Sequence, residues 1–152
     1  MAAADILIVD DDPGIRELLA DILETRCPRR LGLSVNVQVA ENWGGVTRVF
    51  EENPDFNPRV ALVDLNFELV GGSAVAGIDE VLPRLRPLRD LLPGFEAMQI
   101  VIYSGQVGDA ETDRYRDEAR KGGAYDFWPK DRITEGERLV ALVGELLGMG
   151  DA

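Results

Sequence analysis

The chain has 152 residues, 45% of them hydrophobic and 29% charged, which fits one globular, soluble domain. No apolar run approaches the roughly 20 residues that span a bilayer, and the first residues lack the basic start of a secretory signal, so we expect a cytoplasmic protein without a membrane partner. The net charge of −12 argues against direct binding to nucleic acid and favours protein partners, a bound cation or simple solubility.

Apolar stretches alternate with helical patterns along the chain. The first strand is predicted at residues 6–9, and a helix follows it, with Asp12 placed to cap the helix and Pro13 in its first turn. The apolar residues of this helix recur three and four positions apart, namely Ile15, Leu18, Leu19, Ile22 and Leu23. An extended loop is expected over residues 27–34. The next elements are a strand, a less regular helix and a strand, predicted at 35–39, 43–51 and 60–65.

The second half begins with a loop predicted over residues 67–76, whose glycines lack the lysine of a phosphate-binding P-loop. A helix candidate at 78–92 is made irregular by Pro83 and Pro87. A strand, a helix and a strand then follow, predicted at 99–103, 110–121 and 124–128. The last helix carries Leu139, Leu142, Val143, Leu146 and Leu147 at helical spacing, and a frayed tail is expected at 148–152.

Strands that alternate with helices predict right-handed crossovers and a mainly parallel sheet covered on both faces, a three-layer α/β sandwich. We expect a single domain over residues 1–152, with its core at about 4–148 and no output domain. In such sheets, sites form at the carboxyl ends of the strands. The residues that follow each predicted strand are therefore where function is expected.

Chemically active residue types follow four of the five strands. The single Cys27, expected to be a reduced residue without a role, cannot form an intramolecular disulfide, and with no histidine there is no Cys/His zinc site and no Ser–His or Cys–His pair. The strand ends instead carry three acids and a lysine, namely Asp10, Asp11, Asp64 and Lys130, together with Ser104 and Gly105. Clustered carboxylates raise one another's pKa values, a cost that Mg²⁺ removes, so a magnesium site is predicted.

The same set meets the needs of phosphoryl transfer, which are a nucleophile, a metal, a cation and further donors. The nucleophile would be Asp64, the cation Lys130 and a further donor Ser104. Gly105, which has no side chain, leaves access to Asp64. Asp12 is assigned to the helix cap and not to the metal. Each residue alone has an ordinary explanation as a solvated strand end, a surface lysine or a turn, and only the combination favours the functional interpretation.

Four strings, ILIVDDDPGIRELLADIL, VALVDLN, QIVIYSG and GAYDFWPK, resemble in order the signature regions of response-regulator receiver domains, and the resemblance covers essentially the whole chain. It implies a flavodoxin-like, doubly wound (βα)5 fold with strand order 2-1-3-4-5. It also implies that Asp10, Asp11 and Asp64 hold Mg²⁺, or Mn²⁺ in its place, with the main-chain carbonyl of Asn66. Asp64 would be the phosphoacceptor.

The resemblance assigns further roles. Ser104, Gly105 and Lys130 would bind the phosphoryl group, with Ser104 as the switch hydroxyl, and Phe127 would be the switch aromatic, expected to swing inward on activation. Asn66 and Gln106 would tune dephosphorylation. The implied donors are a sensor histidine kinase or a histidine phosphotransfer protein, in a two-component system or phosphorelay with a downstream protein target. Such a protein catalyses only its own phosphorylation and slow dephosphorylation, and is not otherwise an enzyme; dimerisation on activation is left open.

Three features depart from the family pattern. Asp131 follows Lys130 where proline is usual, Glu68 stands four residues after Asp64 where proline is common, and the segment before Gly77 is longer than usual. They bear on loop geometry and partner choice, and the 67–76 loop becomes a candidate specificity element. Two alternatives stay open: a degenerate receiver that binds proteins independently of phosphate, and an aspartate-nucleophile phosphohydrolase, which the Asp10/Asp12 spacing alone supports.

Overall fold

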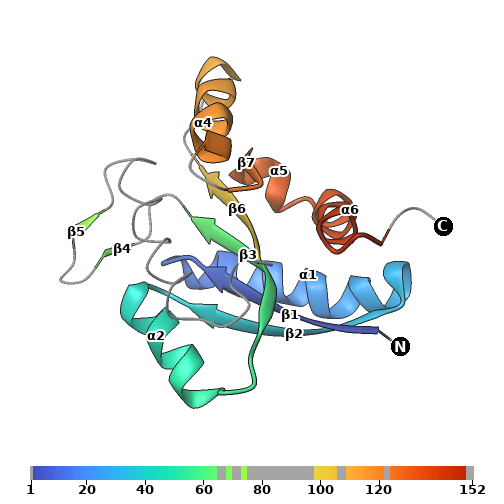
Figure 1. The fold of residues 1–152 in the computed structure, drawn as a ribbon. Coiled ribbons are helices and arrows are strands. Elements are labelled where there is room, and N and C mark those ends of the chain that lie inside the picture. The colour runs from blue at the N-terminus through green and yellow to red at the C-terminus, as the bar shows by residue number, and fades with distance from the viewer. Residues whose placement is uncertain are drawn as a thin grey trace.

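A computed structural model describes residues 2–64, 68–69, 73–74, 98–105, 109–121 and 124–149. Its centre is a parallel five-stranded sheet in the order β2-β1-β3-β6-β7 (Figure 1). The strands are β1 (Ala2–Val9), β2 (Leu33–Ala40), β3 (Pro58–Asp64), β6 (Gln99–Ser104) and β7 (Asp126–Pro129). Counting these five strands alone, the order is the predicted 2-1-3-4-5, so the predicted fold class is confirmed.

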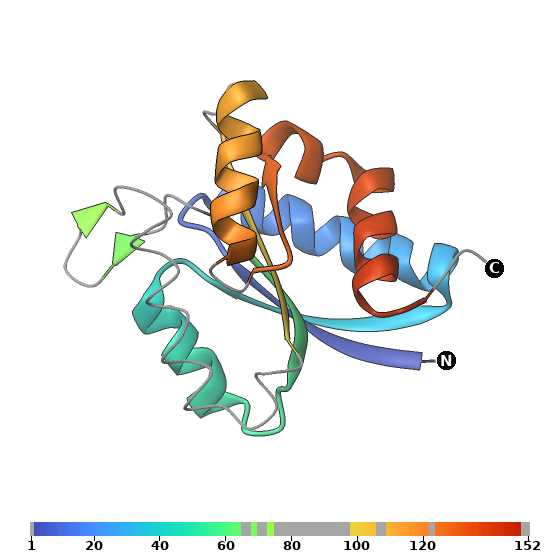
Figure 2. The ribbon, with the colours of Figure 1, turned by 45° about the horizontal axis from the view of Figure 1, so that its top comes forward.

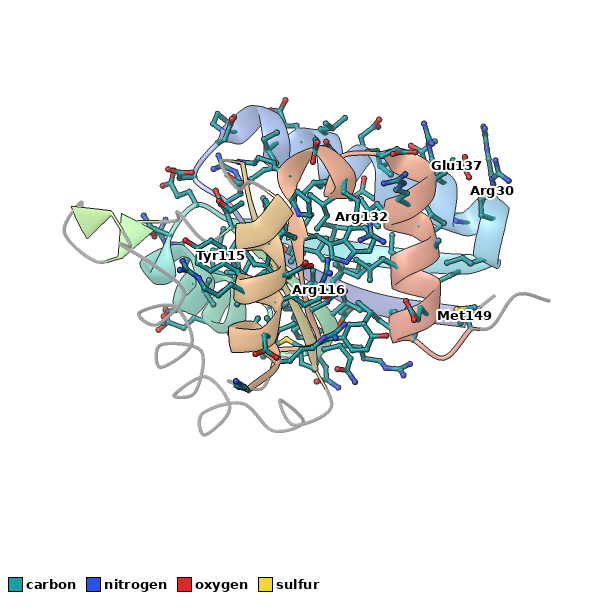
Figure 3. All side chains as sticks on the ribbon, turned by 90° about the horizontal axis from the view of Figure 1, so that it is seen from above. Arg30, Tyr115, Arg116, Arg132, Glu137 and Met149 are labelled. Atoms are coloured by element: carbon teal, nitrogen blue, oxygen red, sulfur yellow. The ribbon has the colours of Figure 1, made fainter. Side chains whose placement is uncertain are left out.

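Helices cover both faces of the sheet (Figure 2). On one face lie α1 (Pro13–Leu31) and α6 (Gly136–Leu146), and on the other lie α2 (Trp43–Glu52) and α4 (Asp109–Lys121). A short helix, α5 (Lys130–Ile133), joins β7 to α6. Arg30 on α1 pairs with Glu137 on α6, with 2.9 Å between Nη2 and Oε1, and Figure 3 shows the two residues side by side. The three layers match the predicted sandwich.

Alternating residues of the three central strands, β1, β3 and β6, pack against opposite helix layers, so these strands are apolar on both faces. Ile6 and Ile8 belong to the core under α1 and α6, whereas Leu7 and Val9 belong to the core under α2 and α4. This is the composition expected of a parallel sheet buried on both sides. The alternation determines which face of the sheet each strand-end side chain lies on.

In the part of the chain that the structure describes, no helix is long and apolar enough to cross a membrane.

The start of α1 agrees with the prediction, but its end does not. Asp12 caps the helix, because its side chain accepts a hydrogen bond of 2.9 Å from the Gly14 N–H, and Pro13 is the first helical residue. The loop predicted over residues 27–34 is wrong: the helix runs through Pro28 to Leu31. Burial of Cys27 and a left-handed Gly32 (φ 62°), whose N–H donates to the Cys27 carbonyl, offset the hydrogen bond that proline removes.

Other differences concern boundaries and loops. The predicted loop 67–76 contains a short antiparallel hairpin of β4 (Glu68–Leu69) and β5 (Ser73–Ala74). The last strand begins at Asp126 rather than at residue 124, although Ala124 is buried before it. The helix candidate at 78–92, Leu65, Gly71, Gly77 and residues 150–152 lie outside the described residues.

Candidate functional site

The carboxyl ends of β1, β3 and β7 bring two acids and a lysine together. Asp10 follows β1, Asp64 ends β3, and Lys130 follows β7. The Lys130 ammonium lies 3.5 Å from Asp64 Oδ2 and 3.6 Å from Asp10 Oδ2. Both carboxylates are almost fully buried, with exposed side-chain fractions of 0% for Asp10 and 2% for Asp64, against 24% for Lys130. Buried charges at these distances interact far more strongly than surface pairs.

Asp11 completes an acidic cluster. One carboxylate oxygen from each of Asp10, Asp11 and Asp64 lies within 4.8 Å of the other two, and Asp11 is exposed while the others are buried. Hard oxygen donors of this kind suit Mg²⁺, which is commonly held by one or two carboxylates and keeps several waters. Because Asp11 is exposed, solvent reaches this side of the cluster. The residues present therefore fit a magnesium ion.

The Asp10 carboxylate is held on both of its oxygens. Oδ1 accepts a hydrogen bond of 2.8 Å from the Asp12 N–H, and Oδ2 accepts one of 2.7 Å from the Tyr103 hydroxyl. Arg16 on α1 also donates to the Asp10 main-chain carbonyl at 2.8 Å. The Asp12 side chain is occupied with the helix cap, as predicted. Asp10 therefore has a defined orientation within the cluster.

Tyr103 is a site residue that the sequence patterns did not reveal. It lies on β6 directly opposite Asp64 of β3, and it is fully buried. Burial, followed by the negative charge of Asp10, raises the pKa of Tyr103 well above its ordinary value, so the hydroxyl stays protonated and donates. Strand alternation was the signal that could have found it, because Tyr103 faces the same side as Asp64.

Ser104 and Gly105 close the site on the side of β6. Ser104 ends the strand and is buried, at 4% exposed, and alternation directs it to the α2 and α4 face. A Cβ on Gly105 would lie 3.4 Å from Lys130 Cδ, so the glycine backbone runs close to the lysine. Lys130 is the first residue of α5, where exposed Asp131 follows it, and the described residues contain no cis peptide bond.

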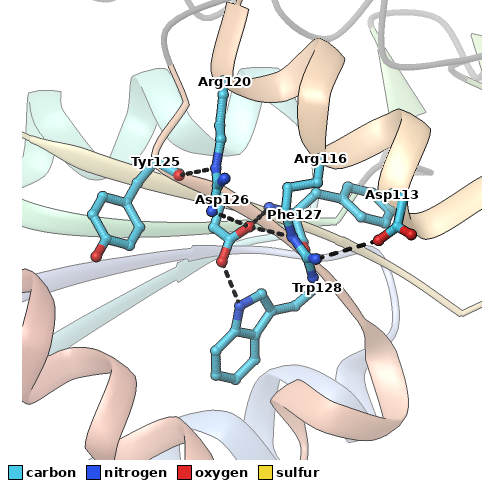
Figure 4. Close-up of polar contacts among 7 residues, drawn as sticks. All are labelled: Asp113, Arg116, Arg120, Tyr125, Asp126, Phe127 and Trp128. Carbon is cyan, nitrogen blue, oxygen red and sulfur yellow. Dashed lines mark hydrogen bonds and ion pairs between the residues drawn. The ribbon is translucent and has the colours of Figure 1, made fainter.

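Phe127 and its neighbours form a second set of contacts under α4. Phe127 is fully buried and packs against Tyr115 of α4, with ring centroids 5.4 Å apart. The next contact, which the sequence did not predict, is centred on Asp126 (Figure 4). Its carboxylate accepts from Arg116 Nε at 2.8 Å and from Trp128 Nε1 at 2.9 Å. The Arg116 bond ties α4 to β7, and the Trp128 bond lies within β7. Asn66 and Gln106 lie outside the described residues.

Comparison with solved structures identifies the fold. The signal receiver domain of a DNA-binding response regulator from Colwellia psychrerythraea matches with a TM-score of 0.65 and 19% identity, over 95% of this chain and 98% of that one. The signal receiver domain of the putative response regulator NarL from Mycobacterium tuberculosis matches with a TM-score of 0.62 and 20% identity, over 97% and 99%. This chain has the receiver-domain fold.

A third receiver domain with this fold comes from a Saccharomyces cerevisiae response regulator and was crystallised together with a histidine phosphotransfer protein. It matches with a TM-score of 0.58 and 17% identity, over 98% of this chain and 90% of that one. No protein-family model and no curated protein matches the chain by sequence. The structural matches confirm, at the level of the fold, the resemblance carried by the four strings. The acidic cluster lies at the carboxyl edge of the sheet, where an open α/β fold places its site.

Proposed function

We propose that this chain is a response-regulator receiver that takes a phosphoryl group onto Asp64 in a Mg²⁺-dependent step and changes a protein-binding surface in response. One observation carries the proposal: in a receiver fold, two buried carboxylates, Asp10 and Asp64, share the ammonium of Lys130 at 3.6 and 3.5 Å. Burying two ionised carboxylates side by side at one edge of the sheet is energetically costly unless a cation and a ligand offset their charge.

The proposed step is an in-line displacement. An Asp64 carboxylate oxygen forms a bond to the phosphorus of a phosphohistidine, and the bond between phosphorus and the imidazole nitrogen breaks. The electron pair stays on the imidazole, which takes up a proton, and Asp64 becomes an acyl phosphate. The Lys130 ammonium, 3.5 Å from Asp64 Oδ2, would pair with a phosphoryl oxygen. Asp10, Asp11, Asp64 and the Asn66 carbonyl would hold Mg²⁺, which supplies charge neutralisation on the phosphoryl oxygens.

The proposed response passes through Ser104 to α4. The Ser104 hydroxyl donates to a phosphoryl oxygen, and by strand alternation Ser104 and Phe127 share the sheet face that α4 covers. The inward swing expected of Phe127 has no outward starting position here, because this side chain is already fully buried. We therefore place the change in the packing of Tyr115 and α4 around Phe127, as a shift between two packed arrangements.

The proposed phosphodonor is a sensor histidine kinase or a histidine phosphotransfer protein, and the proposed output is contact with a protein target. A receiver domain of the same fold bound to a histidine phosphotransfer protein supports the donor class. Asn66 and Gln106 are proposed to tune the hydrolysis of the acyl phosphate. An unchanged rate of dephosphorylation after both are substituted would refute that role.

Intact-mass spectrometry tests the proposal. The purified chain is incubated with a small phosphodonor and Mg²⁺, and we expect one added phosphoryl group, absent with a chelator and absent in Asp64→Asn. The matched control is Asp113→Asn, since the Asp113 side chain is 84% exposed on α4, and it should be modified like the wild type. A folded wild type that takes no phosphoryl group would favour a phosphate-independent binding module.

A further inference from the structure

We propose that Tyr103 is a positioning residue of the metal site: its hydroxyl holds the Asp10 carboxylate for a divalent cation and prevents that carboxylate from closing on Lys130. This inference rests on the proposed function, because it concerns the same magnesium ion. It assigns a role to a residue that lies one position before Ser104 and directly opposite Asp64 in the sheet.

The contact is short, buried and directed at a charge. The Tyr103 hydroxyl donates to Asp10 Oδ2 at 2.7 Å, and both residues have an exposed fraction of 0%. Hydrogen bonds to ionised carboxylates are shorter and about twice as strong as bonds between neutral groups. A buried carboxylate oxygen that loses such a donor must find another one or remain unsatisfied. The hydroxyl is therefore a major determinant of where Asp10 points.

Lys130 is the group that would replace the hydroxyl. Its Nζ lies 3.6 Å from Asp10 Oδ2, the atom that accepts the hydrogen bond from Tyr103, and 3.5 Å from Asp64 Oδ2. Both distances exceed the range of about 2.7–3.2 Å typical of N–H···O hydrogen bonds. The ammonium thus stands between the two carboxylates without a short bond to either of these oxygens. It also lies 5.8 Å from the centroid of the Tyr103 ring, which limits its approach from that side.

A neutral hydrogen-bond donor to Asp10 affects metal binding differently from a cationic donor. The phenol satisfies Asp10 Oδ2 without adding positive charge, so the cluster keeps its full attraction for a divalent cation. If Lys130 closed on Asp10 instead, an ammonium and a metal ion would compete for the same carboxylate. Residues that orient a metal ligand in this way typically change metal affinity by about 10–100-fold when they are substituted.

The test is calorimetric titration of Mg²⁺ into the full chain, a readout independent of phosphorylation. Tyr103→Phe keeps the ring and removes one oxygen, and it should weaken Mg²⁺ binding by about 10-fold. Tyr125→Phe is the matched control, because Tyr125 is a half-buried tyrosine whose hydroxyl interacts with Glu145 rather than with the acidic cluster, and it should bind as the wild type does. Urea titrations establish that each variant is folded.

A double-mutant comparison tests the lysine. Lys130→Met should bind Mg²⁺ more tightly than the wild type, because it removes the competing cation, and in that background Tyr103→Phe should have little further effect. Wild-type affinity in Tyr103→Phe would overturn the inference, as would weaker binding in Lys130→Met or an undiminished Tyr103→Phe effect in its background. A wild type that binds no Mg²⁺ and accepts no phosphoryl group would show instead that the proposed function fails.

Discussion

Replacing Lys130 by methionine should destabilise the metal-free protein strongly, and Mg²⁺ should reverse much of the loss. Methionine keeps an unbranched apolar side chain of similar length, so the main change is the removal of the ammonium. Two carboxylates with exposed fractions of 0% and 2% then lose the cation that lies 3.6 and 3.5 Å from them. Removing the cationic partner of a buried carboxylate is among the few causes of large losses in stability.

The size of the effect follows from the distances. At an effective dielectric constant of about 20, unit charges about 3.5 Å apart attract by about 4–5 kcal/mol, so two contacts set an upper limit of about 9 kcal/mol. Desolvation of the ammonium on folding opposes this attraction by several kcal/mol. Lys130 is also 24% exposed, and the pair is screened accordingly. We expect a net loss of about 3 kcal/mol, equivalent to a fall in Tm of about 6–12 °C for a chain of this size.

Thermal unfolding followed by circular dichroism, in chelator and in excess Mg²⁺, measures the effect. The control is Lys121→Met on α4, whose ion pair with Asp117 is 3.1 Å long but 75% and 70% exposed, and which should change stability by less than about 1 kcal/mol. Mg²⁺ should raise the Tm of Lys130→Met more than that of the wild type, since it neutralises the same carboxylates. Equal Tm values for the two lysine variants in chelator would refute the reasoning.

Two further predictions concern α1. Asp12→Ala removes the cap on the Gly14 N–H and should lower the free energy of unfolding by about 1 kcal/mol in a urea titration, with unchanged Mg²⁺ affinity; weaker Mg²⁺ binding would place Asp12 in the metal site. Burial raises the pKa of Cys27 from 9.0 to about 11 in the folded chain, so its contribution to stability is complete below pH 9 and is lost as pH rises to about 11. In urea titrations between pH 9 and 11, the free energy of unfolding should therefore fall less in Cys27→Ala than in the wild type. Identical pH profiles for the two proteins would contradict this role of the thiol.

Local signals in the sequence predicted the elements that local chemistry determines. Asp12 and Pro13 marked the start of α1 because a cap and a first-turn proline act within one turn of the helix. The end of α1 was mispredicted because Pro28 is a strong local helix breaker, whereas the burial of Cys27 that outweighs it depends on tertiary packing. The β4–β5 hairpin lies in a glycine-containing stretch without the polar and apolar alternation that marks a strand.

The candidate site divides in the same way. Asp10, Asp64 and Lys130 were found because parallel strands bring their carboxyl ends to one edge, so position after a strand is enough. Tyr103 was missed because its role depends on how far a side chain inside the core reaches toward the strand ends. The contact between Asp126 and Arg116 was missed because it joins β7 to α4, and only the packed structure defines how these two elements face each other.

The measurement that tests the central claim most directly is chemical mapping of the phosphoacceptor in the wild-type chain. After incubation with a phosphodonor and Mg²⁺, borohydride reduces an acyl phosphate to an alcohol, and tandem mass spectrometry locates the altered residue. The account predicts reduction at Asp64 alone and none when the metal is chelated. Reduction at Asp10 or at another acid, or no reduction in a folded chain supplied with Mg²⁺, would contradict it.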